Sequence, residues 1–207
     1  MGEGAYMKDE AVEINGFECR IISNPGKGPC IVLLHGYMYT SDVWNEIGLL
    51  RLLEQKGIPF KAIDMPYGHA NESTPRNPDP AENAAIVAGL APPEAVLVGA
   101  SLGGYITLRH CVANQASGVM LIAPVMSLQQ ELASRYSRLS MPVSIIYGDA
   151  DNVVYPQEIR RLARLLDTDV HVYEGARHAA YMDQPERFRK DVLDFYGTIT
   201  RPDNPAA

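Results

Sequence analysis

A serine flanked by glycines at fixed spacing stands between an apolar run and a segment with helical character. The chain reads Gly99-Ala100-Ser101-Leu102-Gly103, directly after Val96-Leu97-Val98. In a sharp strand-to-helix turn of this kind the serine backbone is strained and its hydroxyl is exposed, and the glycines let neighbouring chain approach closely. The pattern predicts a nucleophile elbow. The alternative is a tight turn that merely contains a serine, and a base for the hydroxyl elsewhere in the chain would favour the elbow.

Candidate partners for the serine follow two later apolar runs. A serine hydroxyl is a poor nucleophile until a base takes its proton, and the base needs an acid to orient it. Gly148-Asp149-Ala150-Asp151 ends one run, and Glu174 to His178 ends the next. Open α/β sheets place their sites just past the carboxyl ends of strands. The order serine, aspartate, histidine therefore predicts a catalytic triad.

The elements that must position these residues alternate along the chain. Two short strands at 11–14 and 17–22 are split by Asn15-Gly16, a type I′ hairpin signal. Further strands are expected at 31–34, 60–64, 96–98, 119–122, 143–147 and 170–173, and helices at 81–90, 104–112, 157–166 and 185–196. This alternation predicts an α/β fold: a mostly parallel central sheet with an antiparallel N-terminal hairpin and helices on both faces.

One more helix is expected between the strands at 31–34 and 60–64. Thr40-Ser41-Asp42 offers N-caps, and Gly57 offers a stop. Its apolar face would consist of Trp44, Ile47, Leu50 and Leu53.

Length and composition indicate one ordinary globular domain. The chain has 207 residues, of which 46% are hydrophobic and 21% charged, and we expect a single domain over residues 9–200, with flexible tails at 1–8 and 201–207. A net charge of −7 and a pI near 5.2 disfavour nucleic acid and anionic membranes as partners, because both are bound through clustered cations.

The cysteines indicate neither a disulfide framework nor a metal site. Cys19, Cys30 and Cys111 are odd in number and lack Cys-x-x-Cys spacing, so we expect small buried thiols in a reducing compartment. No N-terminal apolar leader and no run of transmembrane length is present, which favours a cytoplasmic protein. The sequence also lacks phosphate-loop and dinucleotide fingerprints, and no cofactor is expected.

Four ordered motifs together resemble the α/β-hydrolase family over residues 10–197. They are His35-Gly36, the Ser101 elbow, Tyr147-Gly148-Asp149-Ala150-Asp151, and Gly175-Ala176-Arg177-His178 followed by Pro185-Glu186. In the family's Gly-x-x-Asp pattern the second aspartate is the acid. The resemblance therefore implies Ser101, Asp151 and His178 as the catalytic residues, with Asp149 as a turn former.

The resemblance also implies an oxyanion hole and a role for two other histidines. In the family the hole is formed by the backbone N–H after the nucleophile and by one after the His-Gly pair, here Leu102 and Tyr37. His35 would brace that loop, and His69 would be an ordinary loop residue.

The cap that covers the site in many relatives has little room here. Only about residues 126–140 are available for a cap between the strand at 119–122 and the next one, so the chain resembles compact, lidless esterase-like members. Residues beside the triad loops could line an acyl pocket: Tyr37, Met38, Tyr39, Met126, Val153, Val154 and Tyr181.

The leading expectation is a serine carboxylesterase that cleaves short-chain, small-molecule esters through an acyl-enzyme intermediate. The same triad serves other acyl transfers, so an acyltransferase or a thioesterase is an alternative. A ligand-binding protein with little catalysis is the alternative from another class. The sequence also leaves open a homo-oligomer.

Overall fold

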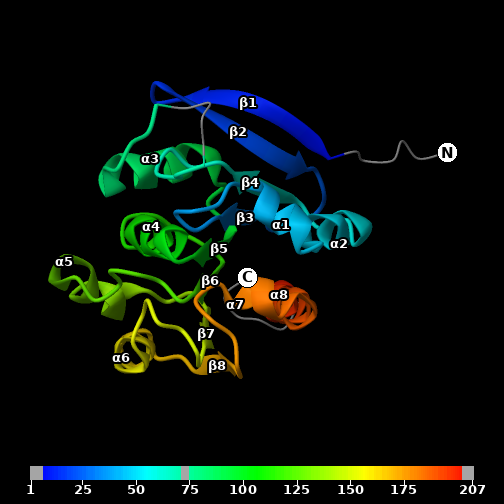
Figure 1. Ribbon diagram of the computed structural model, residues 1–207. Helices are drawn as coiled ribbons and strands as arrows, with labels where there is room; N and C mark the ends of the chain where they lie inside the picture. Colours follow the sequence, from blue (N-terminus) through cyan, green and yellow to red (C-terminus); the bar gives the residue numbers. More distant parts are fainter. Residues whose placement is uncertain (1–6, 71–74, 202–207) are drawn as a thin grey trace.

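An eight-stranded sheet forms the centre of the molecule, in the order β1-β2-β4-β3-β5-β6-β7-β8 (Figure 1). The computed structural model describes residues 7–70 and 75–201. The strands are β1 (Lys8–Ile14), β2 (Phe17–Asn24), β3 (Ile31–Leu34), β4 (Phe60–Ile63), β5 (Val96–Ala100), β6 (Gly118–Ile122), β7 (Val143–Gly148) and β8 (Val170–Tyr173). The predicted α/β class is confirmed.

β1 pairs antiparallel with β2, and β2 pairs antiparallel with β4. From β4 to β8 in the sheet order, all neighbouring strands are parallel. Asn15 and Gly16 both have positive φ, 52° and 83°, as a type I′ turn requires. The expected tails fall largely outside the described residues, although Lys8 already belongs to β1. All four residues of β3 are buried, as expected of a strand covered on both faces.

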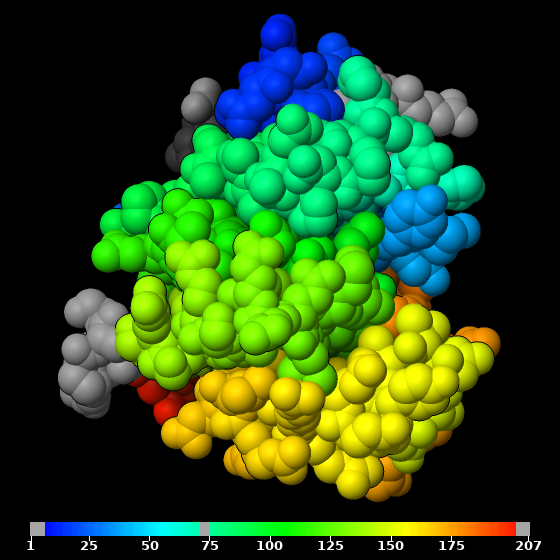
Figure 2. Space-filling view, turned by 90° about the vertical axis from the view of Figure 1, so that its left-hand side faces the viewer, coloured from blue at the N-terminus to red at the C-terminus, as the bar shows by residue number. Residues whose placement is uncertain are grey.

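Helices cover both faces of the sheet. They are α1 (Asp42–Glu46), α2 (Leu49–Gln55), α3 (Pro80–Leu90), α4 (Leu102–Cys111), α5 (Gln130–Ala133), the 3₁₀ helix η1 (Tyr136–Arg138), α6 (Pro156–Leu166), α7 (Ala180–Asp183) and α8 (Pro185–Thr200). In Figure 1, α3, α4, α5 and α6 lie on one side of the sheet, and α1, α2, α7 and α8 on the other. Figure 2 shows the outer surface of the first layer.

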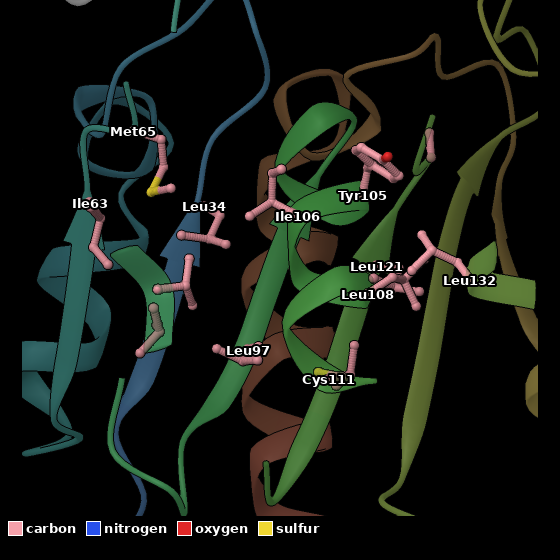
Figure 3. Packing of buried hydrophobic residues seen from close by; sticks show 14 of the residues in the cluster. Leu34, Ile63, Met65, Leu97, Tyr105, Ile106, Leu108, Cys111, Leu121 and Leu132 are labelled. Carbon is pink, nitrogen blue, oxygen red and sulfur yellow. The ribbon is translucent and has the colours of Figure 1, made fainter. Parts of the chain in front are cut away.

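Each helical layer has its own hydrophobic core against the sheet. Under α4, Ile106 and Leu108 pack with Leu34, Leu97 and Leu121 from three neighbouring strands (Figure 3). On the opposite face, Trp44 of α1 and Tyr181 of α7 pack with Phe188 of α8, their rings 5.1 to 6.1 Å apart. Burial on this scale, at roughly 25 cal/mol per Å² of apolar surface, fixes the sheet and its strand ends.

The prediction of a single helix between β3 and β4 is wrong in one respect. The segment forms two helices, α1 and α2, because Gly48 lies between them with a left-handed backbone, φ 71°. The expected apolar face is nevertheless buried: Trp44, Ile47, Leu50 and Leu53 all face the core. The two short helices α5 and α7, and η1, had no clear sequence signal.

No helix within residues 7–70 and 75–201 is long and apolar enough to cross a membrane. The same residues hold no group of three or more His, Cys, Asp or Glu side chains that could bind a metal ion. The three thiols are unpaired, and burial raises the pKa of Cys19 and Cys30 to about 11 and that of Cys111 to about 12. These thiols are therefore poor nucleophiles near neutral pH.

Candidate active site

Ser101 sits at the corner between β5 and α4 with a strained backbone. Its φ is 52° and its ψ is −113°, a region that non-glycine residues rarely adopt. The flanking glycines are needed for close packing. A Cβ on Gly99 would lie 2.5 Å from Thr107 Oγ1, and a Cβ on Gly103 would meet the carbonyl oxygens of Leu34 and His35. The sequence pattern therefore produces the expected elbow, and the corner presents the Ser101 hydroxyl.

A continuous hydrogen-bonded chain joins Ser101, His178 and Asp151. Ser101 Oγ lies 2.8 Å from His178 Nε2, and His178 Nδ1 lies 2.8 Å from Asp151 Oδ2. A carboxylate at Nδ1 fixes the tautomer in which Nδ1–H donates and Nε2 accepts the serine proton. The arrangement can therefore generate a nucleophilic alkoxide and hold the imidazolium that results.

The two aspartates of the 149–151 turn have different partners. The Asp151 side chain is 0% exposed, and its Oδ1 accepts hydrogen bonds from the N–H groups of Val153 and Val154 at 2.7 and 3.2 Å. Asp149 instead accepts from the N–H of Gly175 at 2.6 Å, which ties β7 to the loop that carries His178. Asp151 thus faces the histidine, and Asp149 anchors the histidine's loop.

Close approach of these two loops requires Gly148. A Cβ at that position would collide with the carbonyl oxygens of Ala176 and Arg177. The histidine loop is further fixed by Arg177, whose N–H and guanidinium both bind Asp183 at the end of α7.

Two backbone N–H groups beside Ser101 remain available for an oxyanion. Tyr37 follows His35-Gly36 after β3, and Leu102 is the first residue of α4. Neither N–H donates a hydrogen bond to any of the residues that the structure describes. The amino terminus of α4 adds a favourable dipole for developing negative charge.

His35 braces the loop after β3 from inside the protein. The ring is fully buried, its Nδ1 lies 2.8 Å from Gly36 O, and its Nε2 accepts the N–H of Met65 at 3.0 Å. Burial lowers the pKa of His35 below its usual value. The neutral, Nδ1-protonated ring therefore ties the loop after β3 to the loop after β4.

Two cavities flank Ser101 and share Tyr37 as a wall. The smaller cavity, of about 230 Å³, is lined by Ser101 and His178 among others. The larger cavity, of about 440 Å³, is lined by Leu102 among others. A bigger hollow of about 690 Å³ lies at the amino-terminal ends of the strands and contains none of these residues. Because ligands bind at the carboxyl ends of parallel strands, the two smaller cavities are the relevant ones.

Most of the expected pocket residues line these two cavities. Met38, Tyr39, Val153 and Tyr181 line the smaller one, Met126 lines the larger one, and Tyr37 lines both. Val154 does not line either; it is buried in the core, where its carbonyl accepts a hydrogen bond from Tyr147.

The structure adds one residue that the sequence did not suggest. Arg76, in the proline-rich loop between β4 and α3, lines the larger cavity, and its Nη2 donates to the Tyr37 hydroxyl at 2.9 Å. The length of that loop was the available signal. His69 of the same loop is exposed, with its ring 5.7 Å from that of Tyr37.

A parallel sheet with a strained serine at a strand-to-helix corner, and an acid and a histidine after later strands, defines the α/β-hydrolase class of protein. A model of the alpha/beta hydrolase family matches residues 31–143. The chain belongs to this family, and it is a hydrolase of the α/β-hydrolase superfamily.

Similar proteins agree with this assignment. Protein ABHD14A of Danio rerio is 34% identical over 177 residues, which cover 82% of this chain but 64% of that protein. The putative protein-lysine deacylase ABHD14B of Rattus norvegicus is 31% identical over 185 residues, covering 84% of this chain and 87% of that protein. Among solved structures, a predicted CIB-like hydrolase from Thermoplasma acidophilum has a TM-score of 0.81 at 21% identity, covering 93% of this chain and 99% of that one.

Proposed function

We propose that the protein is a serine hydrolase that cleaves short-chain carboxylic esters through an acyl-enzyme intermediate. The observation that carries this proposal is the chain from Asp151 to His178 to Ser101, with 2.8 Å at each step. The N–H groups of Tyr37 and Leu102, which have no hydrogen-bond acceptor among the described residues, support it, because acyl transfer needs donors where negative charge develops.

In the proposed mechanism Ser101 Oγ attacks the ester carbonyl while His178 Nε2 takes its proton. Asp151 stabilises the imidazolium, and the N–H groups of Tyr37 and Leu102 donate to the oxyanion. His178 then protonates the leaving alkoxide, and the alcohol departs. A water molecule, deprotonated by His178, attacks the acyl-enzyme and releases the carboxylic acid and free Ser101.

Replacing the nucleophile tests this proposal. Ser101→Ala should abolish hydrolysis of 4-nitrophenyl acetate and butyrate, because it removes the attacking oxygen, and with it the partly buried hydrogen bond to His178. Circular dichroism should be unchanged, and a fluorophosphonate probe should label the wild type and not the variant. A purified variant that keeps more than a few per cent of wild-type kcat would show that Ser101 is not the nucleophile.

A second candidate is hydrolysis of an acyl amide on lysine. It rests on the relative named as a putative protein-lysine deacylase. The same triad can cleave amides, because His178 can protonate a leaving amine. Comparing kcat/KM for an Nε-acetyl-lysine peptide with that for an acetate ester, with Ser101→Ala as the blank, separates the two. A higher value for the peptide would replace the ester proposal with the amide one.

A further inference from the structure

The larger cavity beside Ser101 has an arginine at its edge that the proposed mechanism does not use. Apart from Arg76, its described lining is uncharged: Tyr37, Pro66, Tyr67, Asn77, Pro78, Pro80, Asn83, Leu102, Ile106 and Met126. In Figure 2 the light-blue segment that follows β3 lies against the teal segment that leads toward α3. A guanidinium beside the apolar side chains of Leu102, Ile106 and Met126 suits a ligand with an apolar stem and an anionic end.

Tyr37 holds this guanidinium at a fixed distance from the oxyanion hole. Arg76 Nη2 donates to the Tyr37 hydroxyl at 2.9 Å, and Arg76 Cζ lies 5.8 Å from the centre of the tyrosine ring. The Tyr37 N–H is a proposed oxyanion donor. The guanidinium therefore lies one tyrosine side chain away from the reacting carbonyl.

The Arg76–Tyr37 pair has donors to spare. A guanidinium has five N–H donors, and the Tyr37 hydroxyl, which accepts one of them, can still donate its own proton. Among the described residues no Asp or Glu forms an ion pair with Arg76, and no acceptor takes the Tyr37 proton. Together the two side chains can bind both oxygens of a carboxylate.

The position of His178 indicates which part of the substrate enters this cavity. His178 must reach the leaving atom, and it lines the smaller cavity but is not part of the described lining of the larger one. The leaving group therefore fits the smaller cavity. The acyl group then extends past Leu102 into the larger one.

We propose that Arg76 and the Tyr37 hydroxyl recognise a carboxylate at the far end of the acyl group. The preferred substrates are then half-esters of short dicarboxylic acids, whose methylene groups pack along Leu102, Ile106 and Met126. Hydrolysis of such a half-ester consumes one water and releases the dicarboxylic acid and the alcohol. This inference rests on the proposed esterase function.

Matched esters test the inference. Ethanol release is measured for monoethyl succinate, glutarate and adipate, and for ethyl butanoate, pentanoate and hexanoate, which have the same chain lengths without the second carboxylate. In the wild type kcat/KM should favour the half-ester by about tenfold at the best length, the range expected for a charge-assisted hydrogen bond.

Variants assign that preference to Arg76. Arg76→Met keeps a long apolar side chain, removes the charge, and should reduce the half-ester to neutral-ester ratio by about tenfold. Arg76→Lys should keep part of the ratio. Arg161→Met, which removes an exposed charge on α6, is the matched control and should keep all of it.

The outcomes separate this inference from the function on which it rests. A wild type that hydrolyses the neutral esters with no preference for half-esters overturns the carboxylate site alone. An equal loss on both ester types in Arg76→Met shows that the arginine only supports Tyr37, and this also overturns the site. A wild type as inactive as Ser101→Ala on every ester overturns the esterase proposal, and the carboxylate site with it.

Discussion

At the scale of single residues, hydrogen-bond partners separate two aspartates that lie two positions apart. Asp151 reaches His178, whereas Asp149 reaches the N–H of Gly175. The position of both aspartates after a strand end predicts that they lie near the site, but it does not indicate which one faces the histidine. The resemblance to the family's Gly-x-x-Asp pattern indicates Asp151. The structure supplies the physical reason, because the N–H groups of Val153 and Val154 hold the other oxygen of Asp151.

Asp151→Asn should lower kcat by at least about a hundredfold with the fold retained, because an amide lacks the charge and can impose the wrong histidine tautomer. Asp149→Asn should keep most activity and lower the free energy of unfolding by on the order of 1 kcal/mol, through a weaker hydrogen bond to Gly175. For both variants, kcat is measured at saturating substrate and the free energy of unfolding by urea. If Asp149→Asn is the inactive variant, the acid is misassigned.

Arg76 marks the limit of sequence reasoning at this scale. Ser101, Asp151 and His178 stand out because each follows a strand end with a short local motif. Arg76 and Tyr37 are 39 positions apart, and the arginine lies in a proline-rich loop whose path follows no periodic pattern. Only the folded chain brings them together.

At the scale of elements, strands were easier to predict than helices. The parallel strands are continuous apolar runs, so burial on both faces gives them a clear signal. The break between α1 and α2 depends on the backbone of Gly48, which a helical apolar face does not reveal. The loops after β3 and β4 are joined through His35, a contact that neither loop's sequence indicates alone.

The His35 bridge makes stability depend on pH in a defined direction. Burial lowers the pKa of His35, and the pKa of His110 in α4 is also lowered by burial. The unfolded chain, with histidine pKa values near 6.5, therefore binds more protons than the folded chain once the pH falls below that value. Stability from these two neutral rings is fully present above about pH 7 and declines as the pH falls.

Urea unfolding at pH 7.5 and 5.5 measures this dependence. Both pH values lie above the range in which most carboxylates titrate. The free energy of unfolding should be smaller at the lower pH in the wild type. His35→Gln should be less stable at both pH values but lose less between them, and His110→Gln should behave in the same way. An unchanged or larger loss in both variants would contradict the assignment to these histidines.

At the scale of the whole molecule, the connection between β6 and β7 leaves the site open. This connection forms only α5 and η1, and Tyr136 within it is buried, with its hydroxyl donating to Ser127 O at 2.6 Å. It is thus packed onto the sheet layer. Near the opening, Met38 and Val153 are 59% and 54% exposed.

An open site with small cavities should favour short acyl chains. The larger cavity measures about 440 Å³ and is partly lined by polar groups, so added methylenes would soon extend into water and gain no burial. We expect kcat/KM on neutral esters to be highest for roughly C2 to C6 acyl groups and then to fall. Because α5 and η1 are packed onto the sheet layer, neither forms a cap that a lipid surface could open. Activity on tributyrin should therefore show no jump at its solubility limit. The chain-length preference is measured with 4-nitrophenyl esters of increasing length, and the effect of a lipid surface with tributyrin above and below saturation. Higher kcat/KM on long-chain emulsions than on short soluble esters would contradict these expectations.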